Sequence, residues 1–237
     1  VYEETSANCR TFFHFGGAND HFDVEDVDYG ALTQRIYHVA YPLLLKSLDQ
    51  PDAQYGTRMA RMLACAQQAG CLTSMDVVSE DSDRYQQIIW PALHYTDYLT
   101  VNELEASRIT GIPLVREDGS LMEENMPRAL SRMFELGVSR WAVIHAPQAA
   151  FGMDAQGHFA HEKGRQVPPG FIKGTVGAGD AFCVGVLLAA YRGASIDEAL
   201  AYGNASAIQS LQADTPNGSM TTIEESLRLY GALPVNP

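Results

Sequence analysis

Residues 173–193 read KGTVGAGDAFCVGVLLAAYRG, a glycine-rich turn that runs directly into an apolar segment. The small residues at 177–179 let backbone amide groups approach an anion closely. Because the apolar segment predicts a helix over 178–191, these amides and the positive end of the helix dipole point the same way. Asp180 falls in the first turn of that helix. The stretch therefore predicts an anion site with a carboxylate beside it.

Two interpretations of this stretch are open from the residues alone. In the first, the amides stabilise charge on a phosphoryl group in transfer, and Asp180 takes the proton from the attacking hydroxyl. In the second, a glycine-rich turn caps a core helix, with Asp180 placed favourably for the helix dipole. Because glycine-rich helix starts are common, the physics of this stretch does not decide between them.

Strand and helix patterns alternate outward from this stretch. Apolar, β-prone runs predict strands at residues 11–15, 71–78, 98–101 and 141–146, and a hairpin across 151–153 and 158–159. Within 36–45 the run around Pro42 predicts a strand that leads into a turn or a helix start. Helical spacing, closed in several cases by a glycine, predicts helices at residues 55–70, 84–92, 103–110, 126–136, 178–191, 196–211 and 224–230. This alternation favours a parallel sheet with helices on both faces, in one α/β domain.

Composition and charge exclude several classes of protein. The chain has 237 residues, of which 16 are Lys or Arg and 29 are Asp or Glu, giving a net charge of −13. Such a chain has no basic surplus to neutralise nucleic-acid phosphates. No apolar stretch reaches the length of a membrane-spanning helix. The four cysteines show no CxxC spacing, which argues against a zinc site or disulfide scaffold and favours reduced thiols in the cytoplasm.

The segment GTVGAGDAFCVGVLL resembles the C-terminal signature of the ribokinase-like (pfkB) carbohydrate kinases, in which D-T-x-G-A-G-D-x-F-x-x-G is typical. The matching residues are Thr175, Gly177, Ala178, Gly179, Asp180, Phe182 and Gly185. A second segment, Asn102-Glu103-Leu104-Glu105 followed by Thr110-Gly111, resembles the N-x-x-E segment of the family and its trailing T-G. From the residues alone, Asn102 is also explained as a plain helix N-cap with Glu105 as its capping-box partner.

The resemblance implies a ribokinase-like three-layer α/β/α sandwich with a mostly parallel sheet. It implies transfer of the γ-phosphoryl group of ATP to a hydroxyl of a sugar, with Asp180 as general base and the amides of Gly177, Ala178 and Gly179 as anion hole. Asn102 and Glu105 would organise Mg²⁺ through water, in keeping with the oxygen ligands that Mg²⁺ prefers. Thr175, Asn204 and Gly218 would bind nucleotide. A homodimer paired through lid strands is a further implication.

The sequence departs from the family pattern at three places. Gly174 replaces the first Asp of the signature, which in relatives helps to hold a monovalent cation, so potassium activation is not expected here. Pro147 and Ala150 replace two glycines of a loop near the nucleotide. The first strand and the G-G-x-x-x-N-x-A helix of the family do not occur in the sequence, nor does much of the lid.

We therefore expect the part that chooses the acceptor to be missing, so the sugar is not identified. Residues 1–20 are interpreted as a lid and return strand and residues 21–237 as a core with the nucleotide-binding part. Two alternatives are a nucleoside or vitamin kinase of the same fold, and a non-catalytic protein that binds a nucleotide or sugar. His145 ends an expected core strand and is interpreted as a packed core residue. Relatives often carry a hydroxyl residue there, near the phosphates, so contact with nucleotide stays an alternative.

Overall fold

The expected alternation of strands and helices is present in a computed structural model, which describes residues 2–4, 9–11, 14–79 and 83–236. By its internal contacts the chain divides into two compact units. We call residues 16–144 and 151–159 the sheet unit, and residues 1–15, 145–150 and 160–237 the helix unit. The prediction of a single domain stays a prediction.

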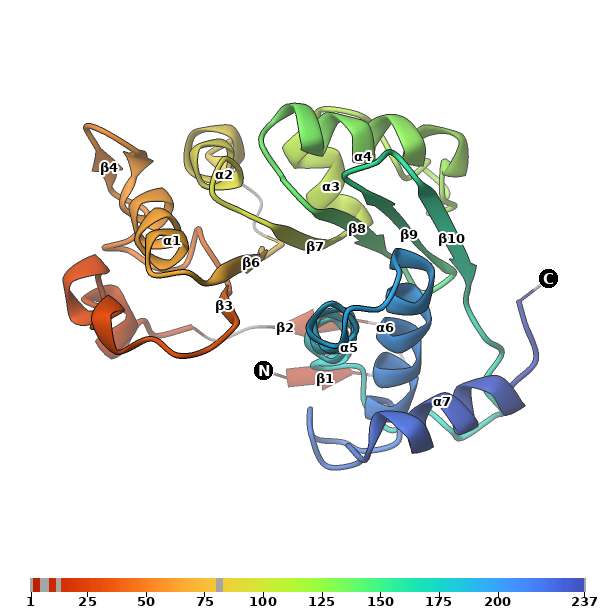
Figure 1. Cartoon of the computed structure of the whole chain (residues 1–237). Coiled ribbons are helices and arrows are strands. Elements are labelled where there is room, and N and C mark those ends of the chain that lie inside the picture. The colour runs from red at the N-terminus through yellow and green to blue at the C-terminus, as the bar shows by residue number, and fades with distance from the viewer. Residues whose placement is uncertain (1, 5–8, 12–13, 80–82, 237) are drawn as a thin grey trace. The chain divides into compact units, whose positions relative to one another are not determined.

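Six strands form the main sheet, in the order β10-β9-β8-β7-β6-β3 (Figure 1). The strands are β3 (Ile36–Val39), β6 (Leu72–Asp76), β7 (Tyr98–Asn102), β8 (Trp141–His145), β9 (Ala149–Asp154) and β10 (Phe159–Lys163). β3 pairs with β6, and β6 with β7, in parallel. Parallel strands need crossover connections, and the helices between these strands supply them.

Helices α1 to α4 of the sheet unit follow one another along the strands, and each contacts the next (Figure 1). Their bounds are α1 (Arg58–Gln68), α2 (Tyr85–Leu93), α3 (Glu103–Thr110) and α4 (Met126–Glu135). Thr57 caps α1 by accepting a hydrogen bond from the Ala60 amide at 3.1 Å. The inward faces of these helices are buried against the strands by apolar side chains such as Met62, Leu63 and Leu130.

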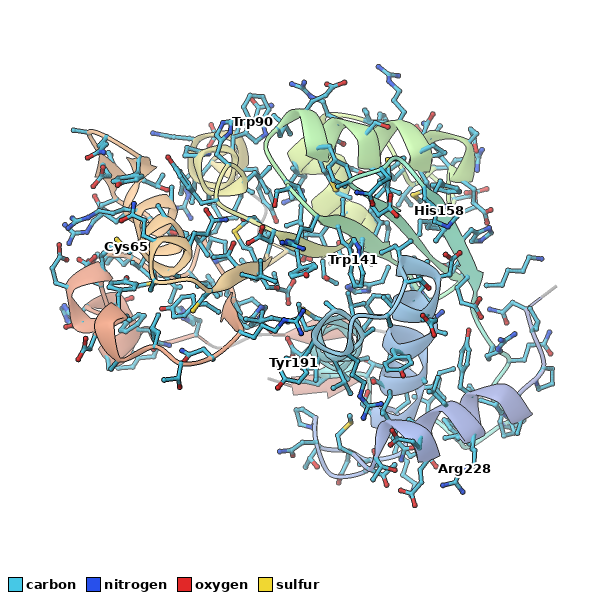
Figure 2. The ribbon with its side chains drawn as sticks, in the orientation of Figure 1. Cys65, Trp90, Trp141, His158, Tyr191 and Arg228 are labelled. Atoms are coloured by element: carbon cyan, nitrogen blue, oxygen red, sulfur yellow. The ribbon has the colours of Figure 1, made fainter. Side chains whose placement is uncertain are left out.

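Two tryptophans mark two different environments of the sheet unit (Figure 2). Trp141 lies on β8, where its ring meets that of Tyr98 edge to face with centroids 5.3 Å apart. Trp90 lies on α2, and its indole N–H donates to the carbonyl of Ile109 at 2.9 Å. The second contact ties α2 to the last turn of α3.

Three helices dominate the helix unit: α5 (Ala178–Arg192), α6 (Ile196–Ser210) and α7 (Ile223–Ala232). α5 and α6 lie side by side and α7 packs on α6. The approach of α5 to α6 is so close that a β-carbon at Gly185 would lie 2.4 Å from the carbonyl oxygen of Tyr202. Gly185 is thus required by helix packing, which gives this signature residue a structural reason.

The helices that the sequence predicts are found within a few residues of the expected bounds, whereas one strand prediction needs correction. The predicted strand 11–15 is wrong in its position, because β2 covers Cys9–Thr11 and His14 and Phe15 are not in a strand; residues 12 and 13 lie outside the described residues. β2 pairs with β1 (Tyr2–Glu4) as an antiparallel hairpin. β3 ends at Val39 and a turn follows at Pro42, as predicted. The assignment of the β1–β2 hairpin to a lid stays a prediction.

Shorter elements that the sequence did not indicate fill the connections. The strands β4 (Pro51–Asp52) and β5 (Gly56–Thr57) form an antiparallel pair before α1. 3₁₀ turns lie at Gly17–Asp20, Val24–Asp26, Tyr29–Ala31 and Glu123–Asn125. Among the described residues, no helix has both the length and the apolar character needed to cross a bilayer.

Candidate functional site

The N-terminus of α5 is built on a residue that has to be glycine. Gly177 is the N-cap, with φ of 85° and ψ of 1°, a left-handed conformation that residues with a β-carbon rarely adopt. A β-carbon at this position would lie 2.6 Å from Cβ of Pro216. Since glycine has no side chain, no side-chain oxygen caps the first turn of α5. The first-turn amides are thus left without the usual cap.

The amides of this turn differ in how they are used. The Ala181 amide donates to the Gly177 carbonyl at 2.8 Å, so the helical hydrogen bonds begin there. The Ala178 amide donates to the carbonyl of Thr175 at 3.3 Å. Within the described part of the chain, the Gly179 amide has no acceptor. Of the predicted anion hole, the amide of Ala178 therefore has a partner already, and that of Gly179 is the donor available to an anion. The next residue, Asp180, is exposed.

A second loop of the helix unit lies against this turn. The Lys173 amide donates to the Leu211 carbonyl at 2.8 Å, and a β-carbon at Gly174 would lie 3.0 Å from the carbonyl oxygen of Ala213. The same loop contains Pro216, which meets Gly177 as described, and continues to Gly218. The structure thus brings Gly218, one of the residues expected to bind nucleotide, into the loop that packs on the glycine-rich turn.

Asn204 lies elsewhere in the helix unit, in a buried polar cluster. Its amide nitrogen donates to the hydroxyl of Tyr230 at 3.4 Å. The Tyr230 hydroxyl donates to Oε1 of Glu162 at 2.5 Å, and burial raises the pKa of this tyrosine well above its ordinary value. Arg165 pairs with the same carboxylate at 3.0 Å. These contacts explain Asn204 as a residue that joins α6 to α7, and its role in nucleotide binding stays a prediction.

The Asn102–Glu105 segment of the sheet unit forms a complete capping box at the start of α3. Oδ1 of Asn102 accepts from the amides of Leu104 at 2.9 Å and Glu105 at 2.8 Å, and Oε2 of Glu105 accepts from the Asn102 amide at 2.9 Å. Ser79 joins them: its hydroxyl donates to Oε1 of Glu105 at 2.7 Å and lies 2.9 Å from Nδ2 of Asn102. The predicted capping box is therefore confirmed, and the role of Asn102 and Glu105 toward magnesium stays a prediction. The sequence did not indicate Ser79 as a hydrogen-bond partner of these two residues.

Burial raises the pKa of Glu105 to about 7, against the hydrogen bonds from Asn102 and Ser79, which lower it. The side chain is 4% exposed. Each carboxylate oxygen accepts one hydrogen bond and retains a lone pair, so the group fits contact with a magnesium-bound water better than direct coordination of the ion. In the described ranges no group of three or more His, Cys, Asp or Glu side chains could hold a metal.

His145, at the end of β8, lies against the glycine-rich turn within the helix unit. A β-carbon at Gly179 would lie 3.4 Å from Cε1 and 3.7 Å from Nε2 of the imidazole. The ring packs on that of Phe182, with centroids 4.8 Å apart and an interplanar angle of 30°. Burial lowers the pKa of His145 to about 4, although the charge of Asp180 acts to raise it. The imidazole is therefore neutral at neutral pH.

The two other departures from the family pattern lie just after His145. Pro147 is exposed in the turn between β8 and β9, and Ala150 is buried on β9. The Ala146 amide donates to the Ala149 carbonyl at 2.9 Å, which closes this turn.

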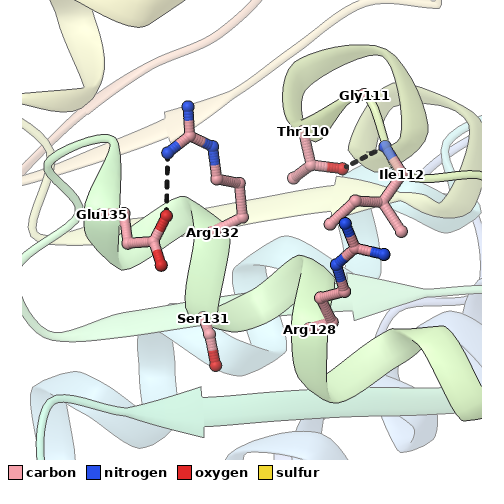
Figure 3. A pocket seen from close by; sticks show the side chains of 7 residues that line it. All are labelled: Thr110, Gly111, Ile112, Arg128, Ser131, Arg132 and Glu135. Carbon is pink, nitrogen blue, oxygen red and sulfur yellow. Dashed lines mark hydrogen bonds and ion pairs between the residues drawn. The ribbon is translucent and has the colours of Figure 1, made fainter.

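A separate concave region of about 380 Å³ lies in the sheet unit between the end of α3 and α4 (Figure 3). Its lining residues are Thr110, Gly111, Ile112, Arg128, Ser131, Arg132 and Glu135. Arg132 pairs with Glu135 at 2.8 Å, and Ser131 points away from the two guanidinium groups (Figure 3). The region holds none of the predicted site residues and lies at the opposite end of α3 from Asn102.

The sequence profile of the pfkB family carbohydrate kinases matches residues 2–223. The chain belongs to this family. The two motifs on which the resemblance was based, at Asn102–Glu105 and around Asp180, both lie inside the matched range. A search of the curated proteins finds no match.

Solved structures share the fold of this pfkB chain. Ribokinase from Arabidopsis thaliana, complexed with ribose and ATP, is 22% identical with a TM-score of 0.62, over 82% of this chain and 55% of that one. The 2-dehydro-3-deoxygluconokinase of Thermotoga maritima is 18% identical with a TM-score of 0.70, over 90% and 66%. Phosphofructokinase-2 of Escherichia coli, in complex with potassium, is 18% identical with a TM-score of 0.58, over 83% and 55%.

These comparisons confirm the predicted ribokinase-like α/β fold of the pfkB chain. The chain spans between 55% and 66% of the length of these three solved relatives.

Proposed function

We propose that this pfkB-family chain takes part in ATP-dependent transfer of a phosphoryl group to a hydroxyl of a sugar. The observation that carries the proposal is the N-terminus of α5, where an uncapped first turn, a Gly179 amide without an acceptor among the described residues and the carboxylate of Asp180 follow one another. Donors fixed before the reaction stabilise charge that develops on a transferred phosphoryl group.

In this proposal Asp180 is the general base. Its carboxylate is exposed and takes the proton from the acceptor hydroxyl as that oxygen attacks the γ-phosphorus. The amide of Gly179, together with that of Gly177, holds an oxygen of the phosphoryl group. Thr175 and the loop that contains Gly218 lie beside this turn and are assigned to nucleotide binding, as is Asn204.

Asn102 and Glu105 are assigned to the magnesium ion through bound water. Mg²⁺, when bound with the nucleotide, neutralises part of the phosphate charge. The capping box holds the Glu105 carboxylate in one position through the Asn102 amide and the Ser79 hydroxyl. A side chain fixed in this way orders water at a constant place, which suits a role through solvent.

The substrate and the partners are proposed from the family. The acceptor is a sugar or a sugar-like alcohol, and a nucleoside or vitamin alcohol is the alternative within the same fold. The free thiols of Cys65, Cys71 and Cys183 agree with a reducing, cytoplasmic setting. A homodimer stays a prediction.

The proposal is tested by measuring the release of ADP from Mg-ATP with the wild-type chain and an Asp180→Asn variant. The acceptor panel contains pentoses, hexoses, sugar acids, nucleosides and vitamin alcohols. We expect one acceptor class to stimulate release, and Asp180→Asn to lower kcat by about 10²- to 10⁴-fold with little change in the affinity for ATP. Full activity in Asp180→Asn would refute the assigned base. Binding of Mg-ATP in calorimetry without transfer to any acceptor would favour the non-catalytic alternative, to which Gly174, Pro147 and Ala150 lend support.

A further inference from the structure

The three residues that follow β6 are each held by a hydrogen bond within the sheet unit. The Val77 amide donates to the carboxylate of the residue before it at 2.7 Å, and the Val78 carbonyl accepts from the hydroxyl of Tyr85. The Ser79 hydroxyl donates to Oε1 of Glu105 at 2.7 Å. The chain is therefore fixed along its path from the sheet to the start of α3, although Ser79 itself is exposed.

The Ser79 hydroxyl makes two hydrogen bonds of opposite direction. It donates to Glu105, because an ionised carboxylate can only accept. Since its one hydrogen is used there, its oxygen accepts from Nδ2 of Asn102 at 2.9 Å. Oδ1 of Asn102 then faces the first amides of α3, from which it accepts two hydrogen bonds. One exposed hydroxyl thus sets the orientation of a side-chain amide and of a carboxylate whose residue is 4% exposed.

Tyr85 is a buried residue with no part in the proposed phosphoryl transfer. It is the first residue of α2, and its hydroxyl donates to the Val78 carbonyl. The Arg108 guanidinium of α3 lies over its ring, 5.5 Å from the centroid. Because the peptide group between Val78 and Ser79 is planar, a fixed Val78 carbonyl also fixes the direction in which the chain enters Ser79. Tyr85 therefore supports Ser79 through the backbone.

We propose that Ser79 and Tyr85 are positioning residues for the proposed magnesium site, Ser79 by contact with Asn102 and Glu105 and Tyr85 through the Val78 carbonyl. The proposal rests on the proposed function, in which Asn102 and Glu105 act on Mg²⁺ through water. Residues that orient the side chains of a metal site affect metal affinity although they do not touch the ion. The role is separate from the capping of α3, because the capping box is complete without Ser79.

The proposal is tested by the gain in ATP affinity that Mg²⁺ provides. Calorimetry gives this gain as the ratio of the ATP affinity in magnesium chloride to that in EDTA. The ratio reports on the ion, whereas a general loss of structure lowers both affinities together. We expect Ser79→Ala to lower the ratio by roughly 10- to 100-fold and Tyr85→Phe by a smaller factor, with the affinity in EDTA unchanged. Ser79→Thr keeps the hydroxyl and should retain most of the ratio.

Matched controls remove the same chemical group elsewhere in the sheet unit. Ser107→Ala removes a hydroxyl of α3 that donates to the Glu103 carbonyl at 2.7 Å. Tyr98→Phe removes the hydroxyl of another buried tyrosine. Both controls should keep the wild-type ratio, because neither hydroxyl bonds to Asn102, Glu105 or the Val78 carbonyl among the described residues.

The possible outcomes separate this proposal from the proposed function. A wild-type ratio in both Ser79→Ala and Tyr85→Phe would overturn the positioning roles alone. A lowered ratio in Ser79→Ala with a wild-type ratio in Tyr85→Phe would overturn the role of Tyr85. A wild-type chain whose ATP affinity does not rise with Mg²⁺ would refute the magnesium site of the proposed function, and both roles with it. If Tyr85→Phe does not fold, the two Ser79 variants still decide the proposal, because Tyr85 acts through Ser79.

Discussion

Pro216 lies so close to Gly177 that a β-carbon on the glycine would be 2.6 Å from Cβ of the proline. The two residues belong to different loops, and their contact sets the distance between the glycine-rich turn and the loop that contains Gly218. Because Gly177 also has a φ of 85°, both its conformation and its surroundings exclude a side chain. The shape of the proposed anion hole thus depends on a residue that contributes only backbone.

The Gly177→Ala variant should therefore lose both stability and nucleotide binding. The left-handed conformation costs a residue with a β-carbon about 1–2 kcal/mol, and the clash with Pro216 adds to this. Gly193→Ala is the matched control, because Gly193 ends the same helix with a φ of 74° and has open space around it. Thermal unfolding and calorimetry with Mg-ATP measure the two effects. Equal losses of stability in the two variants would contradict the role given to Pro216.

The raised pKa of Glu105 predicts a pH-dependent stability. A carboxyl group with a folded-state pKa of about 7 and an ordinary value of 4.5 contributes stability that is complete below the ordinary value and is lost as the pH rises through 7. We expect the unfolding free energy of the wild type, relative to Glu105→Gln, to fall by up to about 3 kcal/mol between about pH 4.5 and pH 7.5. Urea unfolding across that range measures the difference. Glu117→Gln, at an exposed position, controls for loss of charge, and parallel curves for wild type and Glu105→Gln would contradict the assignment.

The polar cluster around Tyr230 predicts that one substitution lowers the free energy of unfolding without changing the affinity for Mg-ATP. Tyr230→Phe removes the hydrogen bonds to Glu162 and Asn204 and should cost roughly 1–3 kcal/mol of unfolding free energy. We expect its affinity for Mg-ATP to stay at the wild-type value, whereas Asn204→Ala should weaken that affinity if Asn204 contacts the nucleotide as proposed. The same affinity in both variants would assign Asn204 to the polar cluster alone. Calorimetry on the two purified variants supplies the comparison.

Gly174 predicts that phosphoryl transfer does not depend on potassium. The residue offers no carboxylate to a monovalent cation, and its α-carbon lies against the backbone of Ala213 and Asp214, where a β-carbon would be 3.0 Å from a carbonyl oxygen. We expect equal rates in potassium chloride and in tetramethylammonium chloride at the same ionic strength. A rate that rises several-fold with potassium would show that other oxygens hold the cation.

Most regular elements could be predicted because their ends carry local signals. α3 was expected at residues 103–110 and is found there, since Asn102 caps its start and Gly111 follows its end in the left-handed conformation. The same holds for α5, which lies between its N-cap Gly177 and its C-cap Gly193, both in the left-handed conformation. The strands β4 and β5 escaped prediction because two-residue strands are too short for an alternating pattern.

The sequence motifs of the candidate site could be predicted, whereas the side-chain contacts between distant parts of the sequence could not. The glycine-rich turn and the Asn102–Glu105 pair are local, and each has a signature within a few residues. Ser79 joins Glu105 across 26 residues of sequence, and nothing in its own surroundings marks it as a partner. The interpretation of His145 as a packed core residue misses its approach to Gly179, because only the folding of the helix unit brings residues 145–150 close to the start of α5. Such tertiary contacts produce no periodic pattern in the sequence from which they could be predicted.

The way the chain alternates between its two compact units has a consequence for experiments on fragments. Residues 145–150 and 160–237 belong to the helix unit, while residues 151–159 between them belong to the sheet unit. No single cut therefore releases either unit whole: a protease that cleaves in the turn of the β9–β10 hairpin removes a piece from both. Truncated fragments would therefore lack part of the unit that they are meant to contain. Point substitutions in the intact chain are the means of assigning function to its parts.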